Sequence, residues 1–264
     1  MCTTCGCGSD PHDHGHHHHH HDGDHEHHHH DHVHEETRTV RLERDLLAKN
    51  ARLAATNRRN AARDRLALFN VIGSPGAGKT ALLESLVRRI GPRMPVGVLE
   101  GDQATRLDAE RIERAGCRVV QINTDTGCHL DATMIERGLR GLAPARGSIV
   151  FVENVGNLVC PALFDLGERA KVVVMSVTEG DDKPLKYPHV FRAARAFVLT
   201  KMDLLPHVPF DVEQCITRAR SIAEHPLDVI RTSSQTGEGI EELVAWILRN
   251  AMPTEADILL EVQP

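Results

Sequence analysis

A glycine-rich stretch in this chain has the composition of a phosphate-binding loop. GSPGAGKT meets the full pattern G-x-x-x-x-G-K-[ST]. In this pattern backbone N–H groups surround the phosphates of a nucleotide, the lysine reaches the terminal phosphates, and the last hydroxyl ligates Mg²⁺. An apolar run precedes the stretch and the helical ALLESLVRRI follows it, which disfavours an incidental glycine turn. We therefore predict that the phosphates and Mg²⁺ are bound by Gly73, Ser74, Gly76, Ala77, Gly78, Lys79 and Thr80.

A second stretch, LTKMD, could select the base. An aspartate accepts two hydrogen bonds from the N1 and N2 donors of guanine, and adenine lacks the exocyclic amine, so Asp203 favours GTP. Thr200 departs from the usual Asn of N-K-x-D, which leaves the contact of that side chain open. Farther on, VIRTSSQTGEG resembles the base-contacting loop of GTPases. We expect base recognition by Lys201, Asp203, Ser233 and Ser234; the alternative is an ordinary Lys and Asp that close a strand.

Cysteines at the amino terminus could bind a metal ion. MCTTCGC places Cys2, Cys5 and Cys7 within six residues, beside an α-amino group. Thiolates with an amine favour square-planar nickel, although zinc would also bind. The alternative is a frayed tail with incidental cysteines.

Two further segments carry possible metal ligands. TGCHLDATMI places Cys128 and His129 side by side, and ENVGNLVCP places Cys160 seven residues after Glu153. Together these two cysteines and one histidine would form a metal centre beside the nucleotide site. Spacing alone leaves open the alternative of two buried cysteines and a surface histidine. Cys117 and Cys215 are expected to be packing residues, because neither has another Cys or a His close by in the sequence.

Histidines are concentrated near the amino terminus, where the tract from His12 to His34 holds 15 of the 19 in the chain. An expression tag is normally a clean terminal hexahistidine, whereas Asp, Glu and Gly interrupt this tract. Neutral imidazoles ligate borderline divalent ions, and flexible sites of this kind are many and weak. The tract therefore suits metal storage, with ligands that include His16, His17, His18, His19, His20 and His21.

Charge and composition exclude several classes of protein. The first 37 residues are acidic and contain no Lys or Arg, so the rest of the chain is close to neutral although the formal net charge is −6. With only 3% aromatic residues, the chain lacks the basic surface and the stacking residues of a nucleic-acid binder. No apolar run reaches the length of a membrane span, and no signal peptide is evident. We expect a cytoplasmic protein with reduced thiols.

The elements that must position these residues follow from the hydrophobic pattern. Residues 1–37 are too polar to form a core and predict a disordered Cys/His-rich tail. Residues 38–63 carry Leu42, Leu46, Leu47, Leu53 and Ala54 on roughly helical spacing, which predicts an amphipathic helix that packs on the following domain. In residues 64–264, short apolar runs alternate with helical stretches: LALFNVIG, PVGVLEGD, CRVVQIN, SIVFVEN, KVVVMSV, AFVLTK and LDVIRTS. This alternation predicts an α/β P-loop domain with a mostly parallel sheet flanked by helices.

Several of these segments together resemble one family. The amino-terminal cysteines, the histidine tract, GSPGAGKT, GDQATRLDAERI, NTDTGCHLDA, ENVGNLVCPA, TEGDDKPLKYP and TKMD are similar to segments of HypB, a family of GTPases that help to insert nickel into nickel–iron hydrogenases. The resemblance implies a SIMIBI-class GTPase that dimerises face to face around nucleotide. It implies that Asp108 lies in the first switch, that Asp102 and Glu153 lie near Mg²⁺, and that Lys79, Asp108 and Glu153 serve hydrolysis. It also implies a site made by Cys128, His129 and Cys160 at the dimer interface.

The function implied by this resemblance is GTP-driven delivery of nickel to a hydrogenase large-subunit precursor. The expected partners are that precursor, a companion nickel metallochaperone similar to HypA, and a second copy of the chain in a homodimer promoted by GTP or metal. One alternative is a nickel or zinc store whose GTPase domain only controls assembly. Another is a related urease or cobalamin accessory GTPase, which ENVGNLVCP disfavours.

Overall fold

The computed structural model describes residues 38–101, 107–124, 127 and 129–252. The chain forms two compact units, and the boundary between them follows residue 45. In the first unit, only the first turns of one helix belong to the described residues. The expected tail of residues 1–37 therefore lies outside the description. The same holds for the predicted site residues Cys2, Cys5, Cys7, His16 to His21, Asp102 and Cys128.

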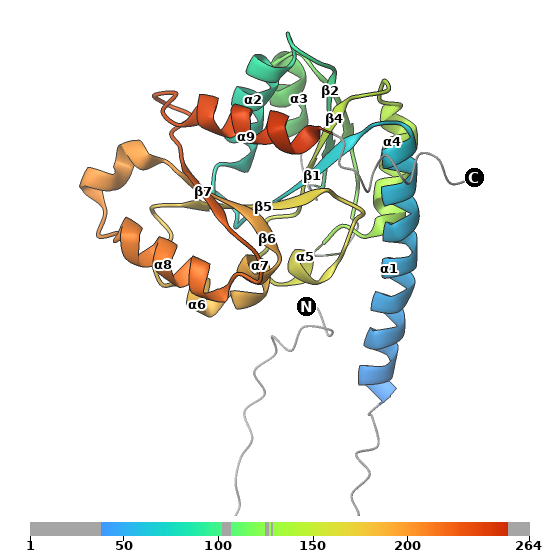
Figure 1. Cartoon of the computed structure of the whole chain (residues 1–264), viewed down its shortest axis with the longest axis horizontal. Helices are drawn as coiled ribbons and strands as arrows, with labels where there is room; N and C mark the ends of the chain where they lie inside the picture. Colours follow the sequence, from blue (N-terminus) through green and yellow to red (C-terminus); the bar gives the residue numbers. More distant parts are fainter. Residues whose placement is uncertain (1–37, 102–106, 125–126, 128, 253–264) are drawn as a thin grey trace, which may run out of the picture. The chain divides into compact units, whose positions relative to one another are not determined.

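A parallel sheet forms the centre of the second unit (Figure 1). Its strands are β1 (Ala67–Ile72), β2 (Val96–Glu100), β3 (Arg118–Gln121), β4 (Ile149–Glu153), β5 (Ala170–Ser176), β6 (Ala194–Thr200) and β7 (Asp228–Arg231). They lie in the order β3-β2-β4-β1-β5-β6-β7, and every neighbouring pair is parallel. Each apolar run identified in the sequence overlaps one of these strands, so the predicted α/β fold is confirmed.

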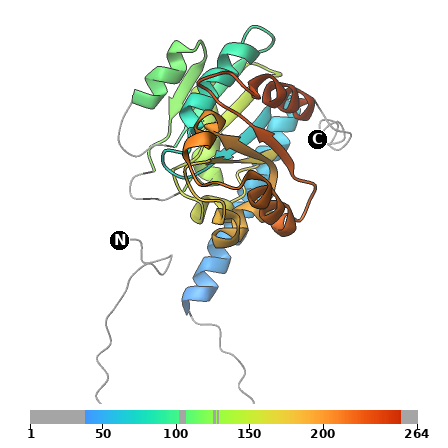
Figure 2. The same cartoon turned by 90° about the vertical axis from the view of Figure 1, so that its left-hand side faces the viewer.

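Helices cover both faces of the sheet. They are α1 (Arg38–Arg63), α2 (Lys79–Ile90), α3 (Leu107–Arg114), α4 (Ala132–Leu142), α5 (Cys160–Leu163), α6 (Lys183–Lys186), α7 (Pro188–Arg192), α8 (Val212–Ile222), α9 (Ile240–Ala251) and the 3₁₀ helix η1 (Met202–His207). Helices α2, α3 and α9 share one apolar core with the sheet, and both views show α2 and α9 next to each other (Figures 1 and 2). Helices α4, α5, α7 and α8 and the second half of α1 pack on the opposite face.

The strands explain why the core has two halves. Side chains along a strand alternate between its faces, so Phe69 and Val71 enter the core with α2, whereas Leu68 and Ile72 enter the core of the other face. All six residues of β1 are buried, as expected of a strand covered on both sides. Because β1 lies between β4 and β5, the chain connections beside its carboxyl end lead in opposite directions along the sheet. In open α/β sheets, ligands bind at such a point.

Helix α1 covers the range expected from the sequence, and Ala54 of its expected apolar face is buried, but Leu46 and Leu47 of that face are exposed. Leu46 and Leu47 are 52% and 37% exposed, whereas the buried positions of the helix include Ala54 and Asn57. Gly167 has no Cβ and lies against the carbonyl of Ala54, so α1 approaches the neighbouring backbone closely there. The small and amide side chains on α1 permit this close approach. The second compact unit includes α1 from Leu46 onward.

Among the helices of the described ranges, none is both long enough and apolar enough to cross a membrane.

Candidate nucleotide and metal sites

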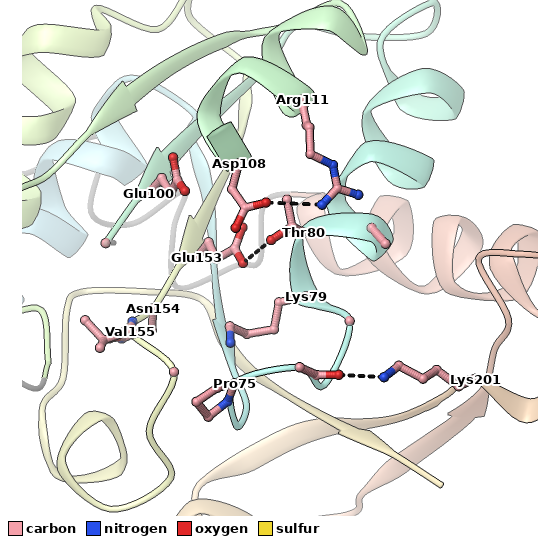
Figure 3. Close-up of a pocket in the computed structure, with 15 residues that line it drawn as sticks. Pro75, Lys79, Thr80, Glu100, Asp108, Arg111, Glu153, Asn154, Val155 and Lys201 are labelled. Carbon is pink, nitrogen blue, oxygen red and sulfur yellow. Dashed lines mark hydrogen bonds and ion pairs between the residues drawn. The ribbon is translucent and has the colours of Figure 1, made fainter. Parts of the chain in front are cut away.

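The glycine-rich loop connects β1 to α2, as the motif predicts. Gly78, the residue before α2, has a φ of 91°, a conformation that side chains with a Cβ rarely adopt. The ammonium of Lys79 lies inside the loop, where it donates to the carbonyls of Gly73 (3.0 Å) and Ser74 (3.2 Å). A pocket of about 590 Å³ opens beside the loop and is lined by Lys79 and Thr80 among others (Figure 3).

Carboxylates from neighbouring strands face the loop across this pocket. The hydroxyl of Thr80 donates to Glu153 Oε1 at 2.9 Å (Figure 3). Glu153 ends β4 and is paired in register with Glu100, which ends β2, and both side chains are buried. A hydroxyl and one or two carboxylates, with phosphate and water oxygens, are the ligands of Mg²⁺ in nucleotide sites, so these residues fit that ion. Asp102, the other residue expected near Mg²⁺, lies outside the described residues.

Asp108 lines the same pocket from the first turn of α3. Arg111 donates to its carboxylate at 3.1 Å (Figure 3). Arg111 also forms an ion pair of 2.7 Å with Glu84 of α2. The arginine therefore links α3 to the helix that follows the phosphate-binding loop and fixes the direction of the Asp108 side chain.

The TKMD segment packs against the phosphate-binding loop. The buried hydroxyl of Thr200, which replaces the usual asparagine, donates to the carbonyl of Ala77 at 2.6 Å. Lys201 follows in the left-handed conformation, with a φ of 58°, and its ammonium donates to the carbonyl of Gly76 at 2.7 Å (Figure 3). The contact left open for residue 200 by the sequence is thus a bond to the loop.

The two segments expected to recognise the base are joined to each other. Ser233 donates its hydroxyl to Asp203 Oδ1 at 2.5 Å and accepts the amides of Gln235 (3.2 Å) and Thr236 (3.1 Å). Ser233 is buried, whereas Ser234 is exposed. The bonds hold the Asp203 carboxylate at the end of the sheet that carries the phosphate-binding loop.

The TEGDDKPLKYP segment also contacts the loop, a role that its sequence alone did not reveal. Glu179 accepts the amide of Ser176 at 2.8 Å and forms an ion pair with Lys183. The ammonium of Lys183 donates to the hydroxyl of Ser74 at 2.7 Å. The segment after β5 therefore supports the phosphate-binding loop from the side opposite Glu153.

The candidate metal ligands His129 and Cys160 belong to neighbouring segments. The ring of His129 stacks on Phe164, with 3.8 Å between the centroids, and Phe164 closely follows α5, which begins at Cys160. Lys171 fixes this segment by donating to the carbonyls of Ala162 (3.0 Å) and Phe164 (3.2 Å). Burial lowers the pKa of His129, which favours the neutral imidazole that binds metals.

Cys128 lies outside the described residues, so the three-residue centre is not tested. In the part of the chain that is described, no three side chains of His, Cys, Asp or Glu form a group that could hold a metal ion. Cys215 is fully buried and Cys117 packs against the core, in keeping with their expected structural role.

Among the polar side chains that line the nucleotide pocket, sequence patterns missed three: Glu100, Arg111 and Asn154. An acid that ends an apolar strand is the signal that could have identified Glu100, because parallel strands end at the same edge. Nothing in the spacing of Arg111 distinguishes it from other charges on an exposed helix. Asn154 lies within ENVGNLVCP, but its contacts depend on residues distant in sequence.

Comparison with known proteins agrees with this geometry. The family model described as CobW/HypB/UreG, nucleotide-binding domain, matches residues 67–227, from the start of β1 to the residue before β7. The hydrogenase maturation factor HypB of Azotobacter vinelandii is 52% identical over 214 residues, which are 81% of this chain and 70% of that protein.

Solved structures show the same likeness. The crystal structure of HypB from Archaeoglobus fulgidus has a TM-score of 0.72 and 38% identity, and the match covers 78% of this chain and all of that one. HypB from Helicobacter pylori, crystallised in complex with nickel, has a TM-score of 0.71 and 34% identity over 77% of this chain and 95% of its own. The resemblance inferred from the motifs is confirmed.

Proposed function

This chain belongs to the HypB family of hydrogenase maturation factors, and on that premise we propose that it is a GTP-hydrolysing nickel metallochaperone. The observation that carries the proposal is the course of one segment, residues 153–160. It begins at Glu153 in the nucleotide pocket, passes so close to the loop that a Cβ on Gly156 would meet Pro75 at 2.9 Å, and ends at the candidate ligand Cys160. Nucleotide and metal would thus act on the same short segment.

Hydrolysis of GTP would depend on charge neutralisation around the terminal phosphate. The loop amides and the Lys79 ammonium bind the phosphates, and Asp203 selects guanine. Thr80 and Glu153, with Asp102, would hold Mg²⁺, which neutralises charge on the phosphate oxygens. We assign to Asp108 the orientation of the attacking water, because its carboxylate lines the pocket and is held by Arg111.

Nickel would be the cargo of a site made by Cys128, His129 and Cys160, to which zinc would also bind. The stacking of His129 on Phe164 supports the closeness of the two segments, and the nickel complex of the Helicobacter pylori relative supports the metal. Cys2, Cys5, Cys7 and the histidine tract would supply further sites. We assign the tract to storage, because redundant flexible ligands give many weak sites.

The proposed partners follow from the family. A nickel–iron hydrogenase large-subunit precursor in the cytoplasm would receive the metal, and a companion nickel metallochaperone would act with this chain. A homodimer promoted by GTP or metal would bring two nucleotide sites and their metal ligands together.

A second candidate function is nickel or zinc storage, which the density of histidines between His12 and His34 favours. In that case GTP turnover would control assembly and would not drive delivery. The two functions differ in whether hydrogenase maturation needs hydrolysis.

The test is complementation of a strain that lacks this protein, with the nickel content of the hydrogenase large subunit as the measurement. Lys79→Ala removes the cation that neutralises phosphate charge, so we expect maturation to fail at low nickel supply. Deletion of residues 12–34, the matched control, should leave maturation intact. Normal maturation with Lys79→Ala would contradict delivery driven by GTP and would favour the store.

A further inference from the structure

Asn154 directly follows Glu153 and joins two parts of the molecule that the proposed function requires to communicate. Its side chain is 2% exposed. Its Oδ1 atom accepts the amide of Leu130 at 3.3 Å and the amide of Val155 at 3.0 Å. Leu130 follows the candidate ligand His129. One buried side chain therefore connects the edge of the nucleotide pocket with residues 129–131, here called the metal-ligand loop.

A chain of hydrogen bonds fixes the orientation of this amide. Asn154 Nδ2 donates to Asn70 Oδ1 at 3.1 Å, and Asn70 Nδ2 donates to Glu168 Oε1 at 3.2 Å. The other oxygen of Glu168 accepts the amide of Leu166 at 2.6 Å. A carboxylate only accepts, so Asn70 must turn its NH₂ toward Glu168 and its oxygen toward Asn154. The oxygen of Asn154 consequently faces the amide of Leu130.

The members of the chain have little freedom to reorient. Asn70 is fully buried on β1, and Glu168 is 7% exposed. Burial raises the pKa of Glu168, and the ammonium of Lys171, 3.7 Å away, acts against this shift. Turning the side-chain amide of Asn70 or of Asn154 would place donor against donor or acceptor against acceptor in the interior, which is costly in a low dielectric. A displacement of the backbone at residue 154 would therefore move the acceptor of the Leu130 amide.

Helix α1 holds the same loop at its other end. Asn50 accepts the amide of Ala132 at 2.9 Å, and Asn57 donates to the carbonyl of Ala132 at 2.8 Å. These two asparagines fix the start of α4, and neither is among the residues that line the nucleotide pocket. They provide a comparison for Asn154, since they are equally buried amides that hold the loop without touching the nucleotide site.

We propose that Asn154 is a positioning residue that carries the nucleotide state from Glu153 to the metal-ligand loop through its bond with the Leu130 amide. Asn70 and Glu168 act through Asn154 by fixing its orientation. The inference rests on the proposed coupling of GTP and nickel, because a positioning residue of this kind has an effect only if the two ligands influence each other.

The experiment measures the coupling itself in the full chain. Dissociation constants for fluorescent GDP and for a fluorescent non-hydrolysable GTP analogue are determined with a chelator present and with saturating Ni²⁺. The coupling factor is the change that nickel causes in the ratio of the two constants. Nickel bound to the tail does not change the coupling factor unless the tail itself binds nickel differently in the two nucleotide states. For the wild type we expect a factor of about five or more.

Asn154→Ala removes the acceptor of the Leu130 amide, and we expect its coupling factor to fall to about one. Asn57→Ala, the matched control, should lower the melting temperature but keep the wild-type factor. An Asn154→Ala protein that keeps the wild-type factor would overturn the inference while leaving the proposed function intact. A wild-type factor of one would instead contradict the coupling of GTP and nickel.

Moving the carboxylate from position 168 to position 154 tests the assigned orientation of the amides. Asn154→Asp loses the donor to Asn70, and Glu168→Gln loses one acceptor, so each variant should be less stable than the wild type. The double variant reverses the direction of every bond between positions 154 and 168 and keeps an acceptor for Leu130. We expect it to be more stable than Asn154→Asp and to retain a coupling factor above one. A double variant no more stable than Asn154→Asp would contradict the orientation.

A measurement on the wild type covers the case in which Asn154→Ala fails to fold. Hydrogen–deuterium exchange of the Leu130 amide is followed in the GDP state and in the GTP-analogue state. The bond to Asn154 should protect this amide to different degrees in the two states. Equal protection would overturn the inference.

Discussion

Ser233 donates its hydroxyl to Asp203 Oδ1 at 2.5 Å, although the two residues are separated by 29 others in the chain. The bond joins the loop after β6 to the loop after β7, two strands that are neighbours at the edge of the sheet. The Ser233 hydroxyl that holds the aspartate also accepts the amides of Gln235 and Thr236. The carboxylate is thus oriented before a base arrives.

Asp203→Asn should weaken GTP binding and improve the binding of xanthosine triphosphate. An amide cannot accept both guanine donors, and hydrogen bonds to a charged group contribute about 1.5–3 kcal/mol, or about 10- to 150-fold in affinity. Titration with fluorescent nucleotides measures both constants. Ser233→Ala is the control, since it removes the hydrogen bond that holds the Asp203 carboxylate but keeps the preference of that carboxylate for guanine. Undiminished GTP affinity in Asp203→Asn would refute guanine recognition by this residue.

Thr200→Val should destabilise the domain, because the carbonyl of Ala77 loses its buried donor. Leaving such a group unsatisfied costs about 1–3 kcal/mol, and each kcal/mol lowers the melting temperature of a domain of this size by roughly 2–4 °C. Differential scanning calorimetry gives the shift. Thr200→Ser retains the hydroxyl and should melt close to the wild type. Equal melting temperatures for the Val and Ser variants would show that this hydroxyl contributes nothing.

Patterns of apolar residues were sufficient for the sheet but not for the surface of α1. The inner strands β1, β4 and β5 are buried on both faces, so their sequences are almost uninterrupted apolar runs rich in β-branched residues. Leu46 and Leu47 have the spacing of a packed helix face, yet Asn50 and Asn57 make the contacts, since they bond to backbone groups at Ala132. Single-sequence spacing cannot identify a buried amide, because its partner lies far along the chain.

The same limit applies to the candidate site. The motif itself places Lys79 and Thr80, because it fixes both the residue types and the local backbone. Glu153 could be placed from the end of its strand together with the family resemblance. The network through Asn154, by contrast, needs the register of β1 against β4, in which Asn70 pairs with Val152. Register is set by the packed sheet and not by any one segment.

Cys117 and Cys215 should resist alkylation in the folded protein. Burial raises the pKa of each thiol to about 12, so at pH 8 only on the order of one molecule in 10⁴ carries a thiolate, the reactive form. Mass spectrometry after brief treatment with iodoacetamide should find both unmodified, whereas both should react in guanidinium chloride. Rapid native labelling of Cys215 would contradict its assignment to the core.

Deletion of residues 12–34 should lower the nickel stoichiometry by several ions without slowing GTP hydrolysis. A tract of redundant ligands stores metal and need not shape the catalytic fold. Equilibrium dialysis measures the bound nickel, and a phosphate-release assay measures turnover. A variant in which a Gly/Ser linker of equal length replaces residues 12–34 separates the loss of ligands from the change in length. Severely slowed hydrolysis in both proteins would make the tract a regulator of the GTPase.

The tightest nickel affinity of the GTPase domain should differ between the GDP state and the GTP-analogue state. Cys160 ends the segment that begins at Glu153, and segments that sense a terminal phosphate rearrange on hydrolysis. By linkage, nickel and nucleotide must change each other's affinity by the same factor, typically about 5- to 150-fold. Competition with a chromophoric chelator measures nickel binding, on protein that lacks residues 1–37 so that tail sites do not contribute.

Two variants and one control assign that difference to the proposed ligands. Cys160→Ala and His129→Ala remove ligands from the two segments that meet at Phe164, so both should weaken nickel binding and abolish its dependence on nucleotide. Cys117→Ala removes a thiol that packs on the opposite face of the sheet and should change neither quantity. Because nickel prefers planar and zinc tetrahedral coordination, zinc should respond to the nucleotide by a different factor. Nickel affinities that are equal in both nucleotide states, or unaffected by Cys160→Ala, would mean that this cysteine only packs and that hydrolysis gives the transfer no direction.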